Sequence, residues 1–147
     1  MVNAIVALED QRYREHNGLD AMGMMRAAIK AVVSPGSRIQ GASTIPQQLI
    51  RNLLLTKDRK IERKIKEILL TSKLSGVLEK TIRKEMGNLS SSALRKEMKN
   101  RTLELYLNYI SFGNNAYGIE AASKTYFDKS AVDLTVLESS ILASIPK

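Results

Sequence analysis

Apolar residues recur at intervals of three and four along most of this chain, and that spacing restricts its fold more than any other feature. In one run, Met24, Ala28 and Val32 follow one another at four-residue steps, which places their side chains on one face of a helix. No stretch alternates apolar and polar residues long enough to predict a strand. The pattern therefore predicts an all-α fold, and 147 residues suffice for one domain with a buried core.

Capping and turn residues predict where several helices begin and end. Thr44 and Gln47 fit a capping box that opens one helix, and Thr135 with Glu138 fits a second. The Ser-Pro-Gly-Ser segment at 34–37 ends the helix before them. Further helices are predicted over 103–110 and 118–126, and two separate amphipathic helices over 74–101, divided at 87–88.

The helix that begins near residue 60 has two distinct faces. Its apolar residues are expected to form a buried stripe: Ile61, Ile65, Ile68 and Leu69. At about 100° per residue, three cations and one carboxylate gather on a different face: Lys60, Arg63, Lys64 and Glu67. Such a face is either a solvated surface with one weak i,i+4 ion pair or a surface that binds an anion.

Composition limits the kinds of site and partner. The formal net charge is +8, from 23 Lys and Arg against 15 Asp and Glu. This excess suggests an anionic partner: a nucleic acid, an anionic membrane surface or a phosphate-bearing substrate. The absence of cysteine excludes disulfides and thiolate metal sites, and one histidine excludes a multi-histidine metal site. Scarce aromatics disfavour stacked single-stranded nucleic acid, and no apolar run approaches the ~18–20 residues of a membrane span.

Two adjacent carboxylates, Glu9 and Asp10, follow the apolar run 4–8 near the start of the chain. An apolar segment that brings a carboxylate to the edge of a core can raise the pKa of that group and make it a general base or acid. On spacing alone, the alternative is an ordinary acidic pair at a helix end, with His16 as a surface or packing residue.

Four stretches, taken together and in order, identify a family. They are Glu-Asp-Gln-Arg-Tyr at 9–13 with His-Asn-Gly at 16–18, Gly-Ala-Ser-Thr-Ile-Pro-Gln-Gln at 41–48, Arg-Lys-Ile-Lys-Glu at 63–67, and Leu-Glu-Leu-Tyr-Leu-Asn at 103–108. The second stretch is the most specific. The set closely resembles the peptidoglycan glycosyltransferase domain (glycosyltransferase family 51) of bifunctional penicillin-binding proteins and monofunctional transglycosylases, over nearly the whole chain.

The resemblance implies a lysozyme-like, two-lobed α-helical fold with a cleft. It implies an enzyme that polymerises lipid II into glycan strands with inversion, releasing undecaprenyl pyrophosphate. The implied partners are lipid II, the growing glycan strand and an anionic membrane surface, but no nucleic acid, and a transpeptidase domain or partner is a further option. The implied location is the outer face of the bacterial cytoplasmic membrane, with the membrane anchor absent from this stretch of chain.

The resemblance also assigns roles to particular residues. Glu9 would be the catalytic base, and Glu67 the second catalytic carboxylate, which assists the leaving group, orients cations or helps to bind a divalent cation (Mg or Mn). A carboxylate that faces a pyrophosphate is repelled unless cations screen it, so a supporting electrostatic role for Glu67 is preferred and no metal site is certain. Substrate binding would fall to Ser43, Gln47, Gln48, Arg51, Arg59, Arg63 and Lys64.

Further residues are expected to support the site. Asp10 would orient the loop that carries Glu9, and Asn108 would pack at a helix end. Tyr13 stands where the family has phenylalanine, so its hydroxyl needs a partner if it is buried. His16 is expected to be structural rather than catalytic. The family's mobile flap falls within 19–39, with disorder expected near 35–37.

The chain departs from the family between the second carboxylate and Tyr106, where it is longer by about one helical hairpin. The domain is therefore expected to span 1–147, partial at both ends, with an insertion at about 76–99. That basic, amphipathic insertion would either touch a membrane or a partner, or be a solvated ornament.

Two other functions compete with the transferase. A lysozyme-like glycan hydrolase would use similar helices and a glutamate, but it would not need cations beside that carboxylate. A non-catalytic basic helical module that binds membrane or nucleic acid agrees with the charge, but it leaves Glu9, Glu67 and the 41–48 motif without a purpose.

Overall fold

The computed structural model describes residues 1–34, 43–55 and 60–146, and only the backbone of residues 31, 60 and 61. These parts form seven α-helices and one 3-10 helix: α1 (Val2–Glu9), α2 (Ala21–Val33), α3 (Ile45–Leu54), α4 (Lys60–Met86), α5 (Ser91–Tyr109), α6 (Ile119–Phe127), η1 (Ala131–Asp133) and α7 (Val136–Ala143). Outside the helices, the described residues contain one isolated β-bridge, between Ser111 and Tyr117. The predicted all-α fold is confirmed.

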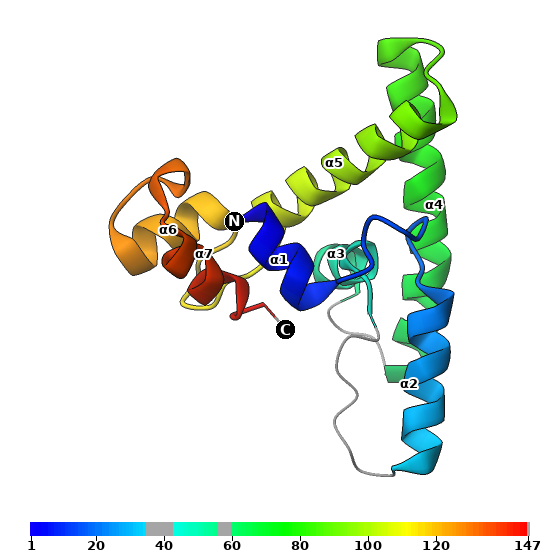
Figure 1. Ribbon diagram of the computed structural model, residues 1–147, viewed down its shortest axis with the longest axis horizontal. Helices are drawn as coiled ribbons and strands as arrows, with labels where there is room; N and C mark the ends of the chain where they lie inside the picture. The colour runs from blue at the N-terminus through cyan, green and yellow to red at the C-terminus, as the bar shows by residue number, and fades with distance from the viewer. Residues whose placement is uncertain (35–42, 56–59, 147) are drawn as a thin grey trace.

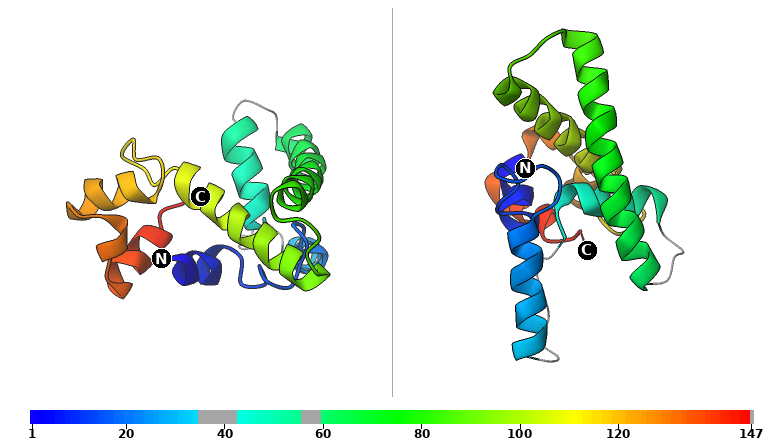
Figure 2. Two further views of the ribbon diagram at one scale, coloured as in Figure 1. Left: turned by 90° about the horizontal axis from the view of Figure 1, so that it is seen from above. Right: turned by 90° about the vertical axis from the view of Figure 1, so that its right-hand side faces the viewer.

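The helices form two groups joined by α5 (Figure 1). On one side lie α1, α6 and α7, and on the other lie α2, α3 and the long α4 (Figure 2). Helix α3 packs against both α4 and α5, and α1 packs against α7. The far ends of α4 and α5 meet in a hairpin that projects from the rest of the molecule. Helix α3 therefore lies where elements from both groups come together.

One apolar core spans the two groups. Three residues of α5, Leu103, Tyr106 and Ile110, point into it from one face because they are three and four positions apart. Helix α3 adds Ile45 and Leu49, again one turn apart. The rest of the buried cluster comes from the chain's two ends: Ile5, Tyr13, Phe112, Ala116, Ala122, Leu142 and Ala143. This core holds the end of α1 beside the start of α3.

Both predicted capping boxes are confirmed. Thr44 N–H donates to Gln47 Oε1 at 3.0 Å, and Gln47 N–H donates back to Thr44 Oγ1 at 3.4 Å. At the start of α7, Thr135 and Glu138 make the same exchange. Each box satisfies two backbone donors that a helix start otherwise leaves unpaired.

The predicted division at 87–88 between two helices within 74–101 is confirmed, but neither helix is separate from its neighbour in the chain. Helix α4 continues through Ser75 and Gly76 to Met86, and the second predicted piece is the first half of α5. A glycine inside a helix costs only about 1 kcal/mol relative to alanine. Packing of α4 against α3 and α5 offsets that cost, so Gly76 does not end the helix.

The predicted buried stripe of α4 is wrong at Ile65 and Leu69, whereas Ile68 is partly buried. Ile65 and Leu69 are 56% and 59% exposed, whereas Glu67 is 3% exposed and Thr71 fully buried. This polar face lies inward where α3 packs against α4, and Lys64 on it donates to Ser43 Oγ, just before α3. Further along α4, the inward face is apolar again at Ile82, which is fully buried. Within the described helices, none is both long and apolar enough to cross a bilayer.

The turn after α5 depends on Gly118. Its φ is +82°, and a Cβ atom there would lie 2.5 Å from the backbone oxygen of Asn108. Only glycine allows this approach without strain. Asn108 thus packs at the helix end through its backbone, while its side chain is exposed.

Candidate active site

Glu9 ends α1 with a half-buried side chain that is held by α3. Gln48 Nε2 donates to Glu9 Oε2 at 2.8 Å. Tyr106, on α5, donates its hydroxyl proton to Gln48 Oε1 at 3.0 Å. Because the hydroxyl occupies the amide oxygen, the amide NH2 group must face the carboxylate. Three helices thus fix one oxygen of Glu9.

Charges around Tyr106 agree with this placement. Burial raises the pKa of the Tyr106 hydroxyl, and the negative charge of Glu9 raises it further. The positive charge of Arg51, one turn beyond Gln48 on α3, acts in the opposite direction. Glu9 and Arg51 therefore both lie within electrostatic reach of the same buried hydroxyl.

Asp10 joins the loop after α1 to the start of α3. Its buried carboxylate lies 3.0 Å from His16 Nε2 and accepts from the backbone N–H of Ile45, also at 3.0 Å. Gly18 N–H donates to His16 Nδ1, so Nδ1 accepts and Nε2 is the donor to Asp10. Thr44 Oγ1 closes the loop by donating to the Gly18 carbonyl at 2.6 Å. His16 therefore has a structural role, as predicted.

A second cluster surrounds Glu67 on α4. Lys64 Nζ donates to Glu67 Oε2 at 3.2 Å, and Arg63 Nε lies 3.7 Å from Glu67 Oε1. Lys64 Nζ also donates to Ser43 Oγ at 3.0 Å, just before α3. The predicted cationic face exists for Arg63 and Lys64, and it surrounds a buried carboxylate rather than lying open to solvent.

The two clusters are continuous. Gln48 Nε2 contacts Glu9 at one side and the backbone oxygen of Ser43 at 3.5 Å on the other. Ser43 then leads through Lys64 to Glu67. The first turn of α3 thus lies between two carboxylates, one bonded to neutral amide groups and one to cations. In such an arrangement, Glu9 can accept a proton, and the cations held by Glu67 can stabilise negative charge.

Comparison with known proteins decides the family. The whole chain, residues 1–147, matches the transglycosylase family. The protein belongs to that family.

Several curated proteins match over nearly the full chain. They include penicillin-binding protein 1A of Escherichia coli (42% identical, covering 100% of this chain), penicillin-binding protein 1A of Aquifex aeolicus (42%, 100%) and penicillin-binding protein 1F of Bacillus subtilis (40%, 98%). The chain spans only 15%, 18% and 17% of the lengths of these relatives. The resemblance proposed from the four motifs is thus confirmed, and with it the lysozyme-like helical fold class.

The structure separates the predicted substrate-binding residues of this transglycosylase domain. Ser43, Gln48, Arg63 and Lys64 lie together in the contacts described above, and Arg51 lies within electrostatic reach of Tyr106. Arg59 lies outside the described residues, as does the segment 35–37 where disorder was expected. Of Lys60 only the backbone is described.

Gln47 does not fit its predicted role as a substrate contact. Its side chain is fully buried, and its Oε1 accepts from Thr44 N–H in the capping box. Gln47 therefore shapes the start of α3, and the neighbouring Gln48 presents its amide to Glu9.

Tyr13 supports the loop after α1 from within the core. Its hydroxyl donates to the backbone oxygen of Lys99 at 2.8 Å, which supplies the partner that the sequence required. Lys99 Nζ donates in turn to the backbone oxygen of Tyr13 and lies 4.1 Å from the centre of its ring. Sequence reasoning did not anticipate this contact with α5, nor the bond of Tyr106 to Gln48, because each joins residues far apart in the chain.

The donor set around Glu67 does not fit a divalent cation held by the protein alone. Both Glu67 oxygens face cationic side chains, and no group of three Asp, Glu, His or Cys residues with metal-binding geometry occurs in the described part of the chain. Mg²⁺ commonly needs one or two free carboxylates besides substrate oxygens.

Proposed function

We propose that this transglycosylase domain polymerises lipid II into glycan strands. The sugar 4-hydroxyl of the acceptor attacks the anomeric carbon of the donor with inversion. A carbon–oxygen bond forms there as the bond to the pyrophosphate breaks. The hydroxyl proton passes to Glu9, and the bonding electron pair leaves with undecaprenyl pyrophosphate. The unbroken path of contacts from Glu9 through Gln48, Ser43 and Lys64 to Glu67 carries this proposal.

Glu9 suits the role of general base. Gln48 holds its Oε2, and among the described residues no group bonds its other oxygen, so Oε1 can accept the proton. A base positioned in this way typically contributes about 10²–10⁴-fold to the rate.

Arg63 and Lys64 suit the role of stabilising the pyrophosphate leaving group. Negative charge grows on the pyrophosphate as its bond breaks, and fixed cations stabilise that state more than the ground state. Glu67 lies between them and holds both cations in place. We assign Glu67 an orienting role because a proton donor at this position would lose contact with its two cations on protonation.

The proposed substrate requires a membrane. The exposed apolar residues of α2 support such a contact, and they are Met22, Met25, Ile29, Val32 and Val33. The net charge of +8 favours an anionic surface. We therefore place the domain at the outer face of the bacterial cytoplasmic membrane. The name shared by its relatives, penicillin-binding protein, supports a transpeptidase domain or partner acting with it.

Labelled lipid II, incubated with the chain in detergent and resolved on a gel, tests the proposal. Wild type should yield a ladder of glycan strands, and Glu9→Gln should lose it while still binding lipid II. The matched control is Glu104→Gln, an exposed glutamate on α5, which should retain full activity. Full turnover by Glu9→Gln would refute the mechanism. Cleavage of preformed glycan without consumption of lipid II would instead indicate a hydrolase.

A further inference from the structure

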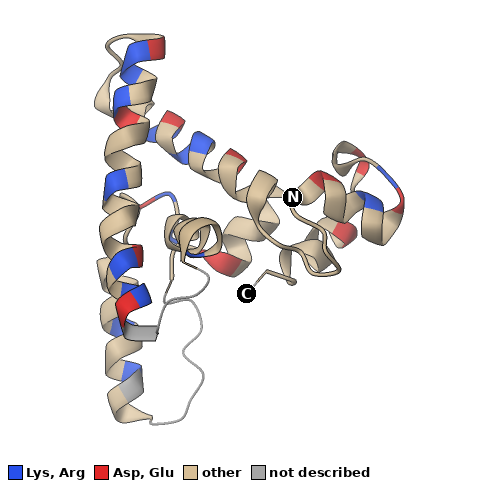
Figure 3. Ribbon diagram, turned by 180° about the vertical axis from the view of Figure 1, so that it is seen from behind, with Lys and Arg blue, Asp and Glu red and all other residues tan. Residues whose placement is uncertain are grey.

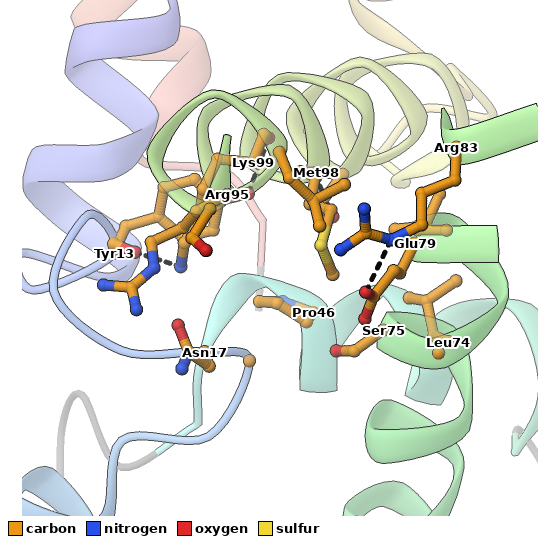
Figure 4. Close-up of a pocket in the computed structure, with 16 residues that line it drawn as sticks. Tyr13, Asn17, Pro46, Leu74, Ser75, Glu79, Arg83, Arg95, Met98 and Lys99 are labelled. Atoms are coloured by element: carbon orange, nitrogen blue, oxygen red, sulfur yellow. Dashed lines mark hydrogen bonds and ion pairs between the residues drawn. The ribbon is translucent and has the colours of Figure 1, made fainter. Parts of the chain in front are cut away.

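A cavity of about 380 Å³ lies between α4, the first half of α5 and the loop after α1 (Figure 4). This volume is within the range of small-molecule sites, about 300–1,000 Å³. The proposed catalytic residues Glu9, Gln48, Lys64 and Glu67 do not line it. The cavity is therefore separate from the site described above, although Tyr13 and Gly18 of the intervening loop border it.

The floor of the cavity is apolar. Leu74 and Leu78 line it from α4, one turn apart, and Leu94 and Met98 line it from α5 with the same spacing. Leu94 is buried, and the other three are partly exposed. Because two helices present matching apolar turns to a shared hollow, the floor can receive a short hydrocarbon chain.

One wall carries two cations without an acid between them. Arg95 and Lys99 are four residues apart on α5, so their side chains lie on the same face. Like charges at this spacing repel each other and destabilise the helix. No acidic partner of Arg95 occurs among residues 1–34, 43–55 and 60–146, and Figure 4 shows its guanidinium near Asn17 at the edge of the cavity.

The Lys99 ammonium donates one of its three hydrogen bonds to the backbone oxygen of Tyr13, which leaves two donors for an anion. Burial, with Arg95 as a further contributor, lowers the pKa of the Lys99 ammonium to about 8, against the opposing effect of Asp10. On the opposite wall, Arg83 Nε pairs with Glu79 Oε1 at 2.9 Å. Among the described residues that line the cavity, the one carboxylate is thus already neutralised, which leaves the Arg95 and Lys99 wall with a positive charge.

We propose that this cavity binds an anionic amphiphile, with a phosphate or carboxylate head at Arg95 and Lys99 and an apolar chain on the floor between α4 and α5. Charge complementarity fixes the head, because a bound anion relieves the repulsion between the two cations. The apolar floor distinguishes this ligand from a free inorganic ion. The head group can belong to a membrane lipid or to a soluble molecule, and the test separates these sources.

Hexyl phosphate is the probe, titrated into the ¹⁵N-labelled chain and followed by NMR. We expect shifts at the cavity and a dissociation constant that Arg95→Gln weakens by about tenfold or more, as loss of a charged hydrogen bond implies. The matched control is Lys96→Gln, the same loss of charge one position along α5 on an exposed residue outside the cavity, which should change affinity less than about twofold. Hexanol and inorganic phosphate should each bind at least about tenfold more weakly than hexyl phosphate.

Two results would overturn the proposal. Weakening by Lys64→Gln but not by Arg95→Gln would assign the anion to the proposed catalytic cations. Equal affinity for inorganic phosphate and hexyl phosphate would remove the floor from the interaction. Sedimentation with phosphatidylglycerol vesicles then identifies the source. A lower vesicle affinity of Arg95→Gln than of Lys96→Gln indicates a lipid head group, and equal affinities indicate a soluble amphiphile.

Discussion

Replacing Asp10 by alanine should strongly destabilise the fold. The Asp10 carboxylate accepts from two buried donors, His16 Nε2 and Ile45 N–H, each at 3.0 Å. Each buried donor left without a partner costs about 1–3 kcal/mol, so Asp10→Ala should lower the free energy of unfolding by about 3–5 kcal/mol. In a domain of this size, 1 kcal/mol corresponds to about 2–4 °C in Tm. Thermal unfolding followed by circular dichroism should therefore show a fall of roughly 10 °C.

Two further variants make this prediction specific. Asp10→Asn keeps one acceptor oxygen and replaces the other by an NH2 group, which cannot accept a hydrogen bond, so its loss should be about half as large. Asp133→Ala is the control, because Asp133 is exposed and should change Tm by no more than about 2 °C. If Asp10→Ala melts within about 2 °C of Asp133→Ala, the carboxylate does not hold the loop to α3 and the reasoning fails.

Three further results are expected. Tyr106→Phe should lower the polymerisation rate by about tenfold or more without weakening lipid II binding, because Gln48 loses the bond that orients its amide. Tyr109→Phe, at an exposed position on the same helix, should keep the wild-type rate, and equal rates of the two variants would show that the Tyr106 hydroxyl has no positioning role. In urea unfolding, Gly76→Ala should raise the free energy of unfolding by about 0.5–1 kcal/mol, because a Cβ there meets nothing within 4 Å. Gly118→Ala should lower it, because its Cβ would lie 2.5 Å from a backbone oxygen, and the opposite order would contradict the placement of both glycines. The pKa of Lys99 is lowered to about 8 in the folded chain, so between about pH 8 and about pH 10.5 the unfolded chain holds a proton on Lys99 that the folded chain has lost. The free energy of unfolding should therefore rise with pH in this window, and Lys99→Met should remove that rise; an unchanged profile would show that Lys99 does not titrate in this range.

The helix ends that the sequence predicted best depend on contacts within a few residues. Thr44 with Gln47 and Thr135 with Glu138 are three residues apart, and each pair satisfies its own helix start. No distant part of the chain is needed for such a motif, so its residues suffice to predict it.

The wrong predictions concern faces whose burial depends on contacts between residues far apart in the chain. Ile65 and Leu69 have the spacing of a buried stripe, yet they are exposed because α3 meets the Glu67 face of α4. Periodicity shows that an apolar face exists, but not which face another element covers. The exposed stripe is consistent with the proposed membrane contact.

In the candidate site, too, the sequence identified residues in local motifs but not the contacts between residues far apart in the chain. The resemblance named Glu9, Gln48 and the cations near Glu67 as site residues, and the structure connects them through contacts. It did not predict that Tyr106 orients Gln48, because these residues are 58 positions apart and neither has an unusual local pattern. It also assigned Gln47 a contact with substrate, whereas the Gln47 side chain is fully buried and its Oε1 accepts from Thr44 N–H in the capping box.

The hairpin formed by α4 and α5 carries the turn at 87–90, most of which is exposed, at its projecting end (Figure 3). Exposed turns of this kind tolerate inserted chain, and both helices are uninterrupted on the way to the site. A reporter peptide or fluorescent label placed between Gly87 and Ser90 should therefore leave glycan synthesis intact, which makes this tip a practical handle for following the enzyme on a bilayer.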